Sequence, residues 1–196
     1  AGFAAMELLS PTSCQPFDAG RDGLVLGEAV AAARLSAQPG TWQISGLRTG
    51  LDAYSATGPD PAGGPIAKLM IECLQQAGIG PADVELIKLQ AAGSPGTDLA
   101  EGNALRQVFG NHPPPLLSLK PYLGHTLGAS GIAELVTLLA CLNAEHIPHS
   151  AGFKEVDPEI MLFPMVDRSN SHVRRALLNL IGFGGGLATM IVERDR

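Results

Sequence analysis

The sequence predicts a layered α/β domain in which a mixed β-sheet lies between helices. Three observations lead to this prediction. Strand-like and helix-like apolar patterns alternate along the middle of the chain, and Gly or Pro separates most of them. In addition, 45% of the 196 residues are hydrophobic, which is enough to fill the core of one sizeable domain.

Apolar stretches bounded by turn-forming residues predict the strands. Pro11, Pro16 and Gly20 mark residues 1–21 as a loop, and the largely apolar residues 24–35 that follow predict a buried strand. Further strands are predicted at residues 42–47, 84–90, 115–119, 176–183 and 186–193. The five strands after residue 41 would form the mixed sheet.

Three stretches predict helices. The first has apolar residues at three- and four-residue spacing and is ended by Gly78; they are Ile66, Leu69, Met70, Cys73, Leu74 and Ala77. The second, residues 98–109, is expected to be capped by Asp98 and closed by Gly110. Residues 127–143 are apolar on nearly every side, so the third helix is expected to be buried in the middle of the protein.

The order of strands and helices also predicts where a ligand would bind. In layered α/β proteins, ligands gather at the carboxyl ends of strands. Gln90 and Phe183 are the last residues of predicted strands, and the turn of residues 120–125 follows another. We therefore expect these residues to lie in one neighbourhood.

Composition excludes several classes of partner. Only 16% of residues are charged and the net charge is −6, so no basic face is expected for nucleic acid or for an anionic membrane surface. The longest apolar run, residues 132–142, is shorter than the ~20 residues that span a membrane, and the first residues lack the basic start of a signal peptide. We expect a cytoplasmic protein that binds neither nucleic acid nor membrane.

The cysteines suggest neither a disulfide framework nor a zinc site. Cys14, Cys73 and Cys141 are an odd number without paired spacing. Cys73 and Cys141 lie on apolar faces of predicted helices, where cysteine more often acts as a small hydrophobic residue than as a nucleophile. We expect free thiols in a reducing compartment and no metal.

Three motifs occur in the order found in one enzyme family. Residues 16–28 read Pro-Phe-Asp-Ala-Gly-Arg-Asp-Gly-Leu-Val-Leu-Gly-Glu, residues 120–131 read Lys-Pro-Tyr-Leu-Gly-His-Thr-Leu-Gly-Ala-Ser-Gly, and residues 179–185 read Asn-Leu-Ile-Gly-Phe-Gly-Gly. They resemble Pro-Phe-Asp-x-x-Arg-Asp-Gly-Phe-Val-x-Gly-Glu, Lys-Ser-x-x-Gly-His-x-x-Gly-Ala-Ala-Gly and Asn-Ser-Phe-Gly-Phe-Gly-Gly of the β-ketoacyl-acyl-carrier-protein synthases, or ketosynthases. The matches extend over almost the whole chain.

The resemblance implies a thiolase-like fold. Residues 1–40 would be the incomplete tail of the N-terminal ketosynthase half, and residues 41–196 the C-terminal half. The implied reaction is a decarboxylative Claisen condensation of an acyl thioester with malonyl-acyl-carrier protein, in fatty acid or polyketide biosynthesis. It requires no metal or organic cofactor beyond the phosphopantetheine of the carrier. The expected partners are an acyl carrier protein and a further ketosynthase subunit, in a homo- or heterodimer.

The resemblance also assigns roles to single residues. His125 would donate from Nε2 to the oxyanion that forms when malonyl loses CO₂, and Lys120 would orient or polarise the histidines of the site. The small residues at 128–131 would let the N-terminus of a helix approach the reacting centre. Phe183 would be an aromatic gatekeeper, and Glu134 a buried carboxylate that steadies the site. Considered alone, His125 and Phe183 would be core residues and Lys120 a surface lysine.

One further motif departs from the family. The family's Ala-His-Gly-Thr-x-Thr-Pro corresponds to Leu-Gln-Ala-Ala-Gly-Ser-Pro at residues 89–95. Gln90 therefore stands in place of a histidine, while Ala92 and Ser94 replace threonines that bind the phosphopantetheine arm. Thr57 still matches a threonine near the pocket. A glutamine amide donates hydrogen bonds but takes no proton, so it can stabilise an enolate oxygen and cannot act as a base.

Two functions are compatible with these residues. The first is a condensing enzyme, which the three matching motifs favour. The second is a non-catalytic subunit resembling a chain-length factor, which shapes the pocket or docks a carrier protein for an active partner; Gln90 and Ala92 favour it. Ketosynthases are longer than this chain, and their nucleophilic cysteine lies in an N-terminal half that precedes the matched region. We therefore expect the 196 residues alone to be inactive.

Overall fold

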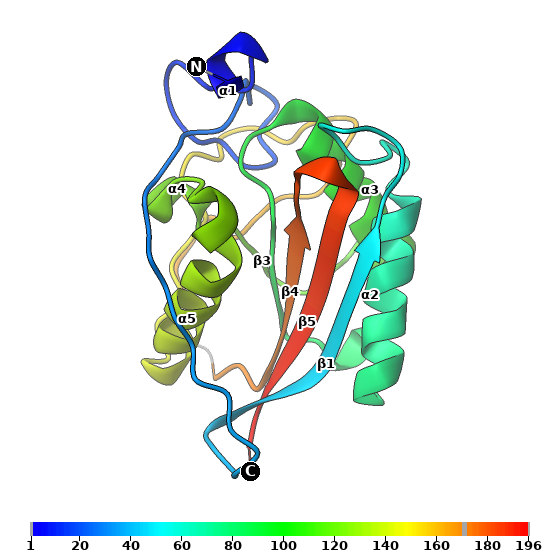
Figure 1. Cartoon of the computed structure of the whole chain (residues 1–196), viewed down its shortest axis with the longest axis vertical. Helices are drawn as coiled ribbons and strands as arrows, with labels where there is room; N and C mark the ends of the chain where they lie inside the picture. Colours follow the sequence, from blue (N-terminus) through cyan, green and yellow to red (C-terminus); the bar gives the residue numbers. More distant parts are fainter. Residues whose placement is uncertain (1, 170–171, 196) are drawn as a thin grey trace.

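The computed structural model describes residues 2–169 and 172–195, which form one sheet with helices on both faces (Figure 1). Its strands are β1 (Trp42–Leu51), β2 (Leu86–Lys88), β3 (Leu116–Leu117), β4 (Arg175–Ile181) and β5 (Gly186–Arg194). Its α-helices are α1 (Gly2–Ala5), α2 (Gly64–Ala77), α3 (Pro95–Phe109), α4 (Lys120–Leu123) and α5 (Ser130–Asn143). Short 3₁₀ turns lie at η1 (Pro81–Asp83), η2 (Leu127–Ala129) and η3 (Phe183–Gly185).

The sheet is mixed, as the sequence predicted. Its strand order is β1-β5-β4-β2-β3. β2 runs parallel to β3 and β4, whereas β5 runs antiparallel to β4 and β1. Parallel neighbours need a crossover, and α3 supplies it between β2 and β3. All five predicted strands of this sheet are confirmed, although β2 and β3 are shorter than predicted.

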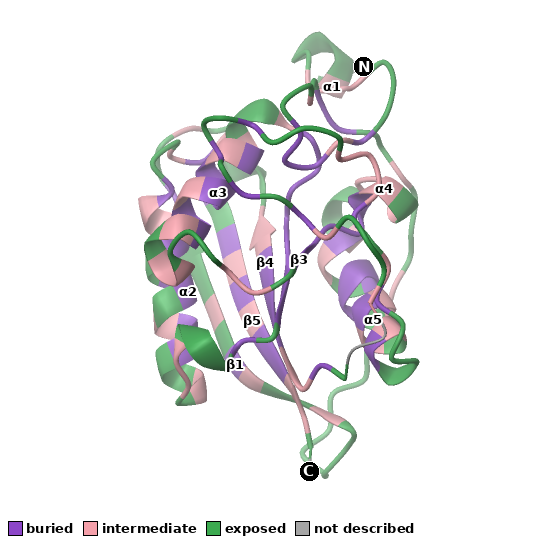
Figure 2. Ribbon diagram, turned by 180° about the vertical axis from the view of Figure 1, so that it is seen from behind, coloured by how far each residue is buried: buried purple, intermediate pink, exposed green. Residues whose placement is uncertain are grey.

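Two hydrophobic cores separate the layers. α2 and α3 cover one face of the sheet and α5 covers the other (Figure 1). Successive side chains of a strand point to opposite faces, so in β2 Leu86 joins the core beneath α5 while Ile87 joins the core beneath α2 and α3. The buried sides of the helices accordingly face the sheet (Figure 2).

The amphipathic helix predicted over residues 66–77 is α2. Its apolar stripe is buried against the sheet; the buried residues include Ile66, Leu69, Met70, Cys73 and Leu74. Gly78 ends the helix with a φ of 69°, and its N–H donates to the carbonyl of Gln75 at 3.1 Å. This left-handed backbone is favourable for glycine, which explains why the helix stops there.

The buried strand predicted over residues 24–35 is wrong. Its first residues make two isolated bridges, and the remainder pairs with no strand in the described part of the chain. Val30 is fully exposed and Leu35 is 75% exposed. The apolar composition of residues 24–35 was not sufficient to predict a strand, because a strand also requires a neighbouring strand for its backbone hydrogen bonds. The segment instead runs along the outside of the molecule beside α5 (Figures 1 and 2).

The start predicted for α3 is also wrong. The helix begins at Pro95, three residues before Asp98, and Ser94 occupies the N-cap position. Proline has a fixed φ suited to the first helical turn, so it extends the helix backwards. The Asp98 side chain is then free to bind the preceding loop. Gly110 ends α3 as predicted.

The third predicted helix is α5, preceded by the η2 turn. Its buried face packs on the sheet through Leu135, Leu138 and Leu142. Ile132 and Val136 are 39% and 37% exposed, so the prediction of burial on all sides is wrong for the described chain. Within residues 2–169 and 172–195, no helix is long and apolar enough to cross a membrane.

Candidate functional site

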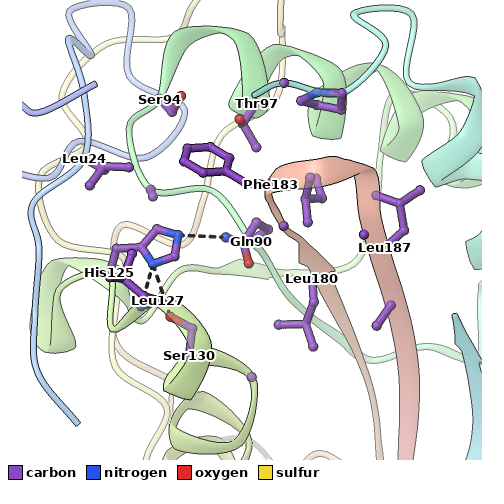
Figure 3. A pocket seen from close by; sticks show the side chains of 18 of the residues that line it. Leu24, Gln90, Ser94, Thr97, His125, Leu127, Ser130, Leu180, Phe183 and Leu187 are labelled. Atoms are coloured by element: carbon purple, nitrogen blue, oxygen red, sulfur yellow. Dashed lines mark hydrogen bonds between the residues drawn. The ribbon is translucent and has the colours of Figure 1, made fainter. Parts of the chain in front are cut away.

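A cavity of about 690 Å³ lies at the carboxyl ends of β1, β2 and β4 (Figure 3). Its wall also includes the start of α5 and parts of the N-terminal segment, and its lining is mostly apolar. Five of the seven candidate site residues line it: Thr57, Gln90, Ser94, His125 and Phe183. Lys120 and Glu134 are buried and lie outside this lining. The structure thus brings together the strand ends that the sequence pointed to.

The N-terminal segment holds the backbone of His125. The His125 N–H donates to the Val25 carbonyl at 2.7 Å, and the Gly27 N–H donates to the His125 carbonyl at 3.1 Å. Glycine is needed at position 27, because a Cβ there would lie 2.1 Å from the carbonyl oxygen of Leu123. Two of the sequence motifs therefore meet at this histidine.

Hydrogen bonds fix the tautomer of His125. The Leu127 N–H donates to Nδ1 at 3.1 Å, so the proton of the neutral ring is on Nε2. Ser130 Oγ lies 3.3 Å from Nδ1 and accepts the Thr126 N–H at 3.1 Å. Burial, followed by the charge of Lys120, lowers the pKa of His125 to about 4. His125 is therefore a neutral donor at physiological pH.

Gln90 faces this donor. Its Nε2 lies 3.5 Å from Nε2 of His125 (Figure 3). Glu101 on α3 fixes the backbone here, accepting the N–H groups of Gln90 and Ala91 at 2.7 Å each. Asn179 on β4 donates to the same carboxylate at 2.7 Å. In this tautomer both nitrogens carry N–H groups, so one oxygen lying beside the pair can accept from both.

Asp98 holds the loop that follows β2. Its carboxylate accepts the N–H groups of Ala92 and Gly93 at 3.1 Å each. It also accepts the N–H of Phe17 at 3.0 Å, which ties the N-terminal segment to the loop. Asp98 is fully buried, and burial raises its pKa to about 7. Its role is to position the backbone around the cavity.

Behind the cavity, one carboxylate pairs with two lysines. Glu134 on α5 binds Lys120 through Oε1 and Lys88 through Oε2, and all three side chains are at most 1% exposed. We call these residues the lysine–carboxylate cluster. Burial and the charge of Lys88 lower the pKa of Lys120 to about 8. Burial alone would raise the pKa of Glu134, but the two lysines outweigh it and hold that pKa below its usual value.

Phe183 occupies the turn between β4 and β5. It is 49% exposed and stacks on Phe3, with ring centroids 5.4 Å apart and planes inclined by 24°. The turn is attached to the loop after β1, because the Asp52 N–H donates to the Gly185 carbonyl at 2.8 Å. Gly184 and Gly185 have φ of 74° and 77°, a backbone that suits glycine.

The cysteines have no nucleophilic character. Cys14, Cys73 and Cys141 are free thiols, as predicted. Burial raises the pKa of Cys14 to about 12 and that of Cys73 to about 11, and it also raises the pKa of Cys141. In the described ranges, no group of three His, Cys, Asp or Glu could hold a metal ion.

Comparison with known proteins defines the class. The family model described as "Beta-ketoacyl synthase, C-terminal domain" matches residues 42–154. The chain is 31% identical to 3-oxoacyl-[acyl-carrier-protein] synthase 2 of Mycobacterium tuberculosis, over 94% of this chain and 48% of that protein. It is 32% identical to nodulation protein E of Rhizobium meliloti, over 98% of this chain and 50% of that protein. The chain belongs to the β-ketoacyl synthase family.

Solved structures agree with this assignment. A β-ketoacyl synthase from Burkholderia phymatum is 25% identical with a TM-score of 0.85, over 100% of this chain and 51% of that chain. A ketosynthase in complex with its chain length factor, from Xenorhabdus doucetiae, is 26% identical with a TM-score of 0.85, over 99% of this chain and 49% of that chain. The fold is thiolase-like, as predicted. The chain spans about half the length of the curated relatives that it matches.

Several residues of this neighbourhood were missed by sequence reasoning. Lys88, Glu101 and Asn179 received no role, and Phe3 was not considered. Lys88 carried a usable signal, since a lysine between the apolar residues Ile87 and Leu89 of a predicted buried strand needs a buried partner of opposite sign. The sequence contains no comparable signal for Phe3, because nothing in it indicates that residue 3 lies beside the β4–β5 turn.

Proposed function

We propose that the chain is the C-terminal half of a β-ketoacyl synthase, an acyltransferase that condenses an acyl thioester with malonyl-acyl-carrier protein in fatty acid or polyketide biosynthesis. One observation carries the proposal: two neutral N–H donors, from His125 and Gln90, lie 3.5 Å apart on the wall of a largely apolar cavity. The curated relative named 3-oxoacyl-[acyl-carrier-protein] synthase 2 supports the reaction class.

In the proposed reaction, the thioester carbonyl of the malonyl group accepts hydrogen bonds from both donors. The bond between its α-carbon and its carboxylate breaks, CO₂ leaves, and the electron pair forms an enolate whose oxygen the two N–H groups stabilise. The α-carbon then attacks the acyl thioester on the cysteine of the N-terminal half, and the cysteine thiolate departs. Neither donor accepts a proton, in agreement with the low pKa of His125 and with the chemistry of an amide.

The remaining site residues act around this step in the proposal. Phe183 controls access to the cavity, and the stack on Phe3 is its closed position. Thr57 and Ser94 lie in the cavity wall where they can contact the phosphopantetheine arm of an acyl carrier protein. Lys120, with Glu134, supports the histidine from behind. A ketosynthase subunit is the proposed partner in a homo- or heterodimer.

A second function has its own support. Gln90 and Ala92 replace residues that the family motif uses, and one of the similar structures is a ketosynthase in complex with its chain length factor. In this alternative, the protein is a non-catalytic subunit that shapes the pocket or docks the carrier for an active partner.

The variant Gln90→His distinguishes the two functions. In a working synthase with a weakened oxyanion site, histidine supplies a stronger donor, so decarboxylation of malonyl-acyl-carrier protein should rise by ~10-fold or more. In a non-catalytic subunit no β-ketoacyl product forms, since a repaired histidine cannot replace a missing nucleophile. The measurements are CO₂ release and β-ketoacyl product formation by the complete protein, with and without a candidate partner synthase.

The matched control is Gln38→His, because Gln38 is exposed and lies in the loop before β1. Its rate should equal that of the parent. A rate that falls in Gln90→His while Gln38→His is unchanged would contradict both functions, and would show that the amide serves another substrate.

A further inference from the structure

We propose that Lys88 is a positioning residue of this site: with Lys120, it holds the Glu134 carboxylate so that Gln90 and His125 remain opposite each other. The inference rests on the proposed function for the reaction that this pair performs. It concerns a residue that the reaction scheme above does not use.

The strand places Lys88 on the same face as Gln90. Side chains two residues apart on a strand point the same way. Leu86 packs in the core beneath α5, Lys88 binds Glu134 of α5, and Gln90 reaches His125. The intervening Ile87 belongs to the opposite core. Lys88 is therefore the side chain that anchors this face of β2 just before the amide donor.

Glu134 connects the two donor-bearing segments. Its Oε2 binds Lys88 on β2, two residues before Gln90, and its Oε1 binds Lys120 at the start of α4, five residues before His125. Because all charged atoms of the cluster are buried, water cannot replace either contact. Glu134 therefore links the two donor-bearing segments through their side chains, in addition to the backbone contacts of Glu101 with Gln90 and of Val25 and Gly27 with His125.

The cluster also places charge behind the site. With both lysines protonated it has two positive charges and one negative charge. Glu101 of α3 faces it from one side, and the neutral thiol of Cys14 faces it from the N-terminal segment. His125 lies in front, and the lysine charges disfavour a further positive charge on its ring. Lys88 thereby also helps to keep His125 an uncharged donor.

The test is Lys88→Met in the complete protein. Methionine has a similar length without the charge, and Glu134 and Lys120 remain as a one-to-one pair, so folding should persist. We expect kcat for malonyl decarboxylation to fall by ~10-fold or more with KM unchanged, because the donors lose their alignment. Loss of the Lys88 charge should raise the pKa of Lys120 above its value of about 8. The alkaline limb of the pH–rate profile should then move to higher pH.

A second measurement needs no activity. The ring signals of His125, followed by NMR against pH, should report a pKa above its value of about 4 in Lys88→Met. Lys88→Gln separates the two contributions, since it retains a hydrogen bond to Glu134 without the charge. It should recover most of kcat but show the same histidine shift. Lys68→Met is the control, because Lys68 is 78% exposed on α2 and should change nothing.

The outcomes are distinct. A parent protein that releases no CO₂ refutes the proposed function, while the histidine titration still tests Lys88. A folded Lys88→Met with unchanged kcat, pH profile and histidine pKa overturns the proposal. Failure of both Lys88 variants to fold also overturns it, because Lys88 would then belong to the core and not to the site.

Discussion

His125 is a neutral hydrogen-bond donor for reasons that are all local. Its Nδ1 accepts the Leu127 N–H, its ring is largely buried, and lysine charge lies behind it. Each feature disfavours a proton on Nδ1. The imidazole is thereby adapted to stabilise negative charge on a substrate oxygen and not to exchange protons with the substrate.

The depressed pKa of His125 should make the protein less stable in acid. An unfolded histidine takes up its proton near pH 6.5, whereas the folded one does so at about 4, so stability is lost as pH falls from about 6.5 to about 4. The variant His125→Gln cannot titrate and should lose less stability over this interval. Urea unfolding at several pH values measures this, and an equal acid loss in both proteins would contradict the assigned pKa.

The residue-level site was only partly predictable from sequence. His125 and Gln90 could be found because their residue types and motif positions indicate a definite chemistry. Lys88 could not be assigned a partner, because Glu134 is 46 residues away and their contact depends on how α5 crosses β2. Motifs identify residues that touch a ligand more readily than residues that position them.

Among the helices and strands, the sequence correctly predicted those features that depend only on residues of the same segment. The stripe of α2 and its Gly78 end were correct because periodicity and a left-handed glycine are properties of the segment itself. The strand at residues 24–35 was wrong because pairing depends on a neighbour elsewhere. Asp98 was misassigned as a cap because its three N–H partners lie in other segments.

Asp98 should be more important for stability than an ordinary helix cap. Asn in its place offers one acceptor oxygen and turns a donor toward N–H groups, so Asp98→Asn should lower the free energy of unfolding by ~2 kcal/mol or more. Chemical denaturation measures the change. Asp22→Asn is the control, since Asp22 is exposed and should change stability little. Equal effects of the two variants would contradict the assigned role.

For the molecule as a whole, the exposed apolar residues indicate a protein–protein interface. Val30, Leu35 and the outer face of α5 would be covered by the N-terminal half of a ketosynthase in the proposed function. A polypeptide of residues 1–196 alone should therefore bind a hydrophobic dye, and Val30→Glu with Leu35→Glu should reduce that binding.

The same polypeptide should have no condensing activity, and turnover of acyl and malonyl carrier thioesters by it would refute this prediction.

In the proposed function, His125 stabilises the oxyanion of a decarboxylating malonyl thioester. This role can be measured as CO₂ release from malonyl-acyl-carrier protein by the complete protein and by its His125→Ala variant, with circular dichroism to verify the fold. We expect the rate of decarboxylation to fall ~10²-fold or more in the folded variant, because it lacks one of two oxyanion donors. Decarboxylation at the parent rate in a folded His125→Ala protein would show that His125 has no such role.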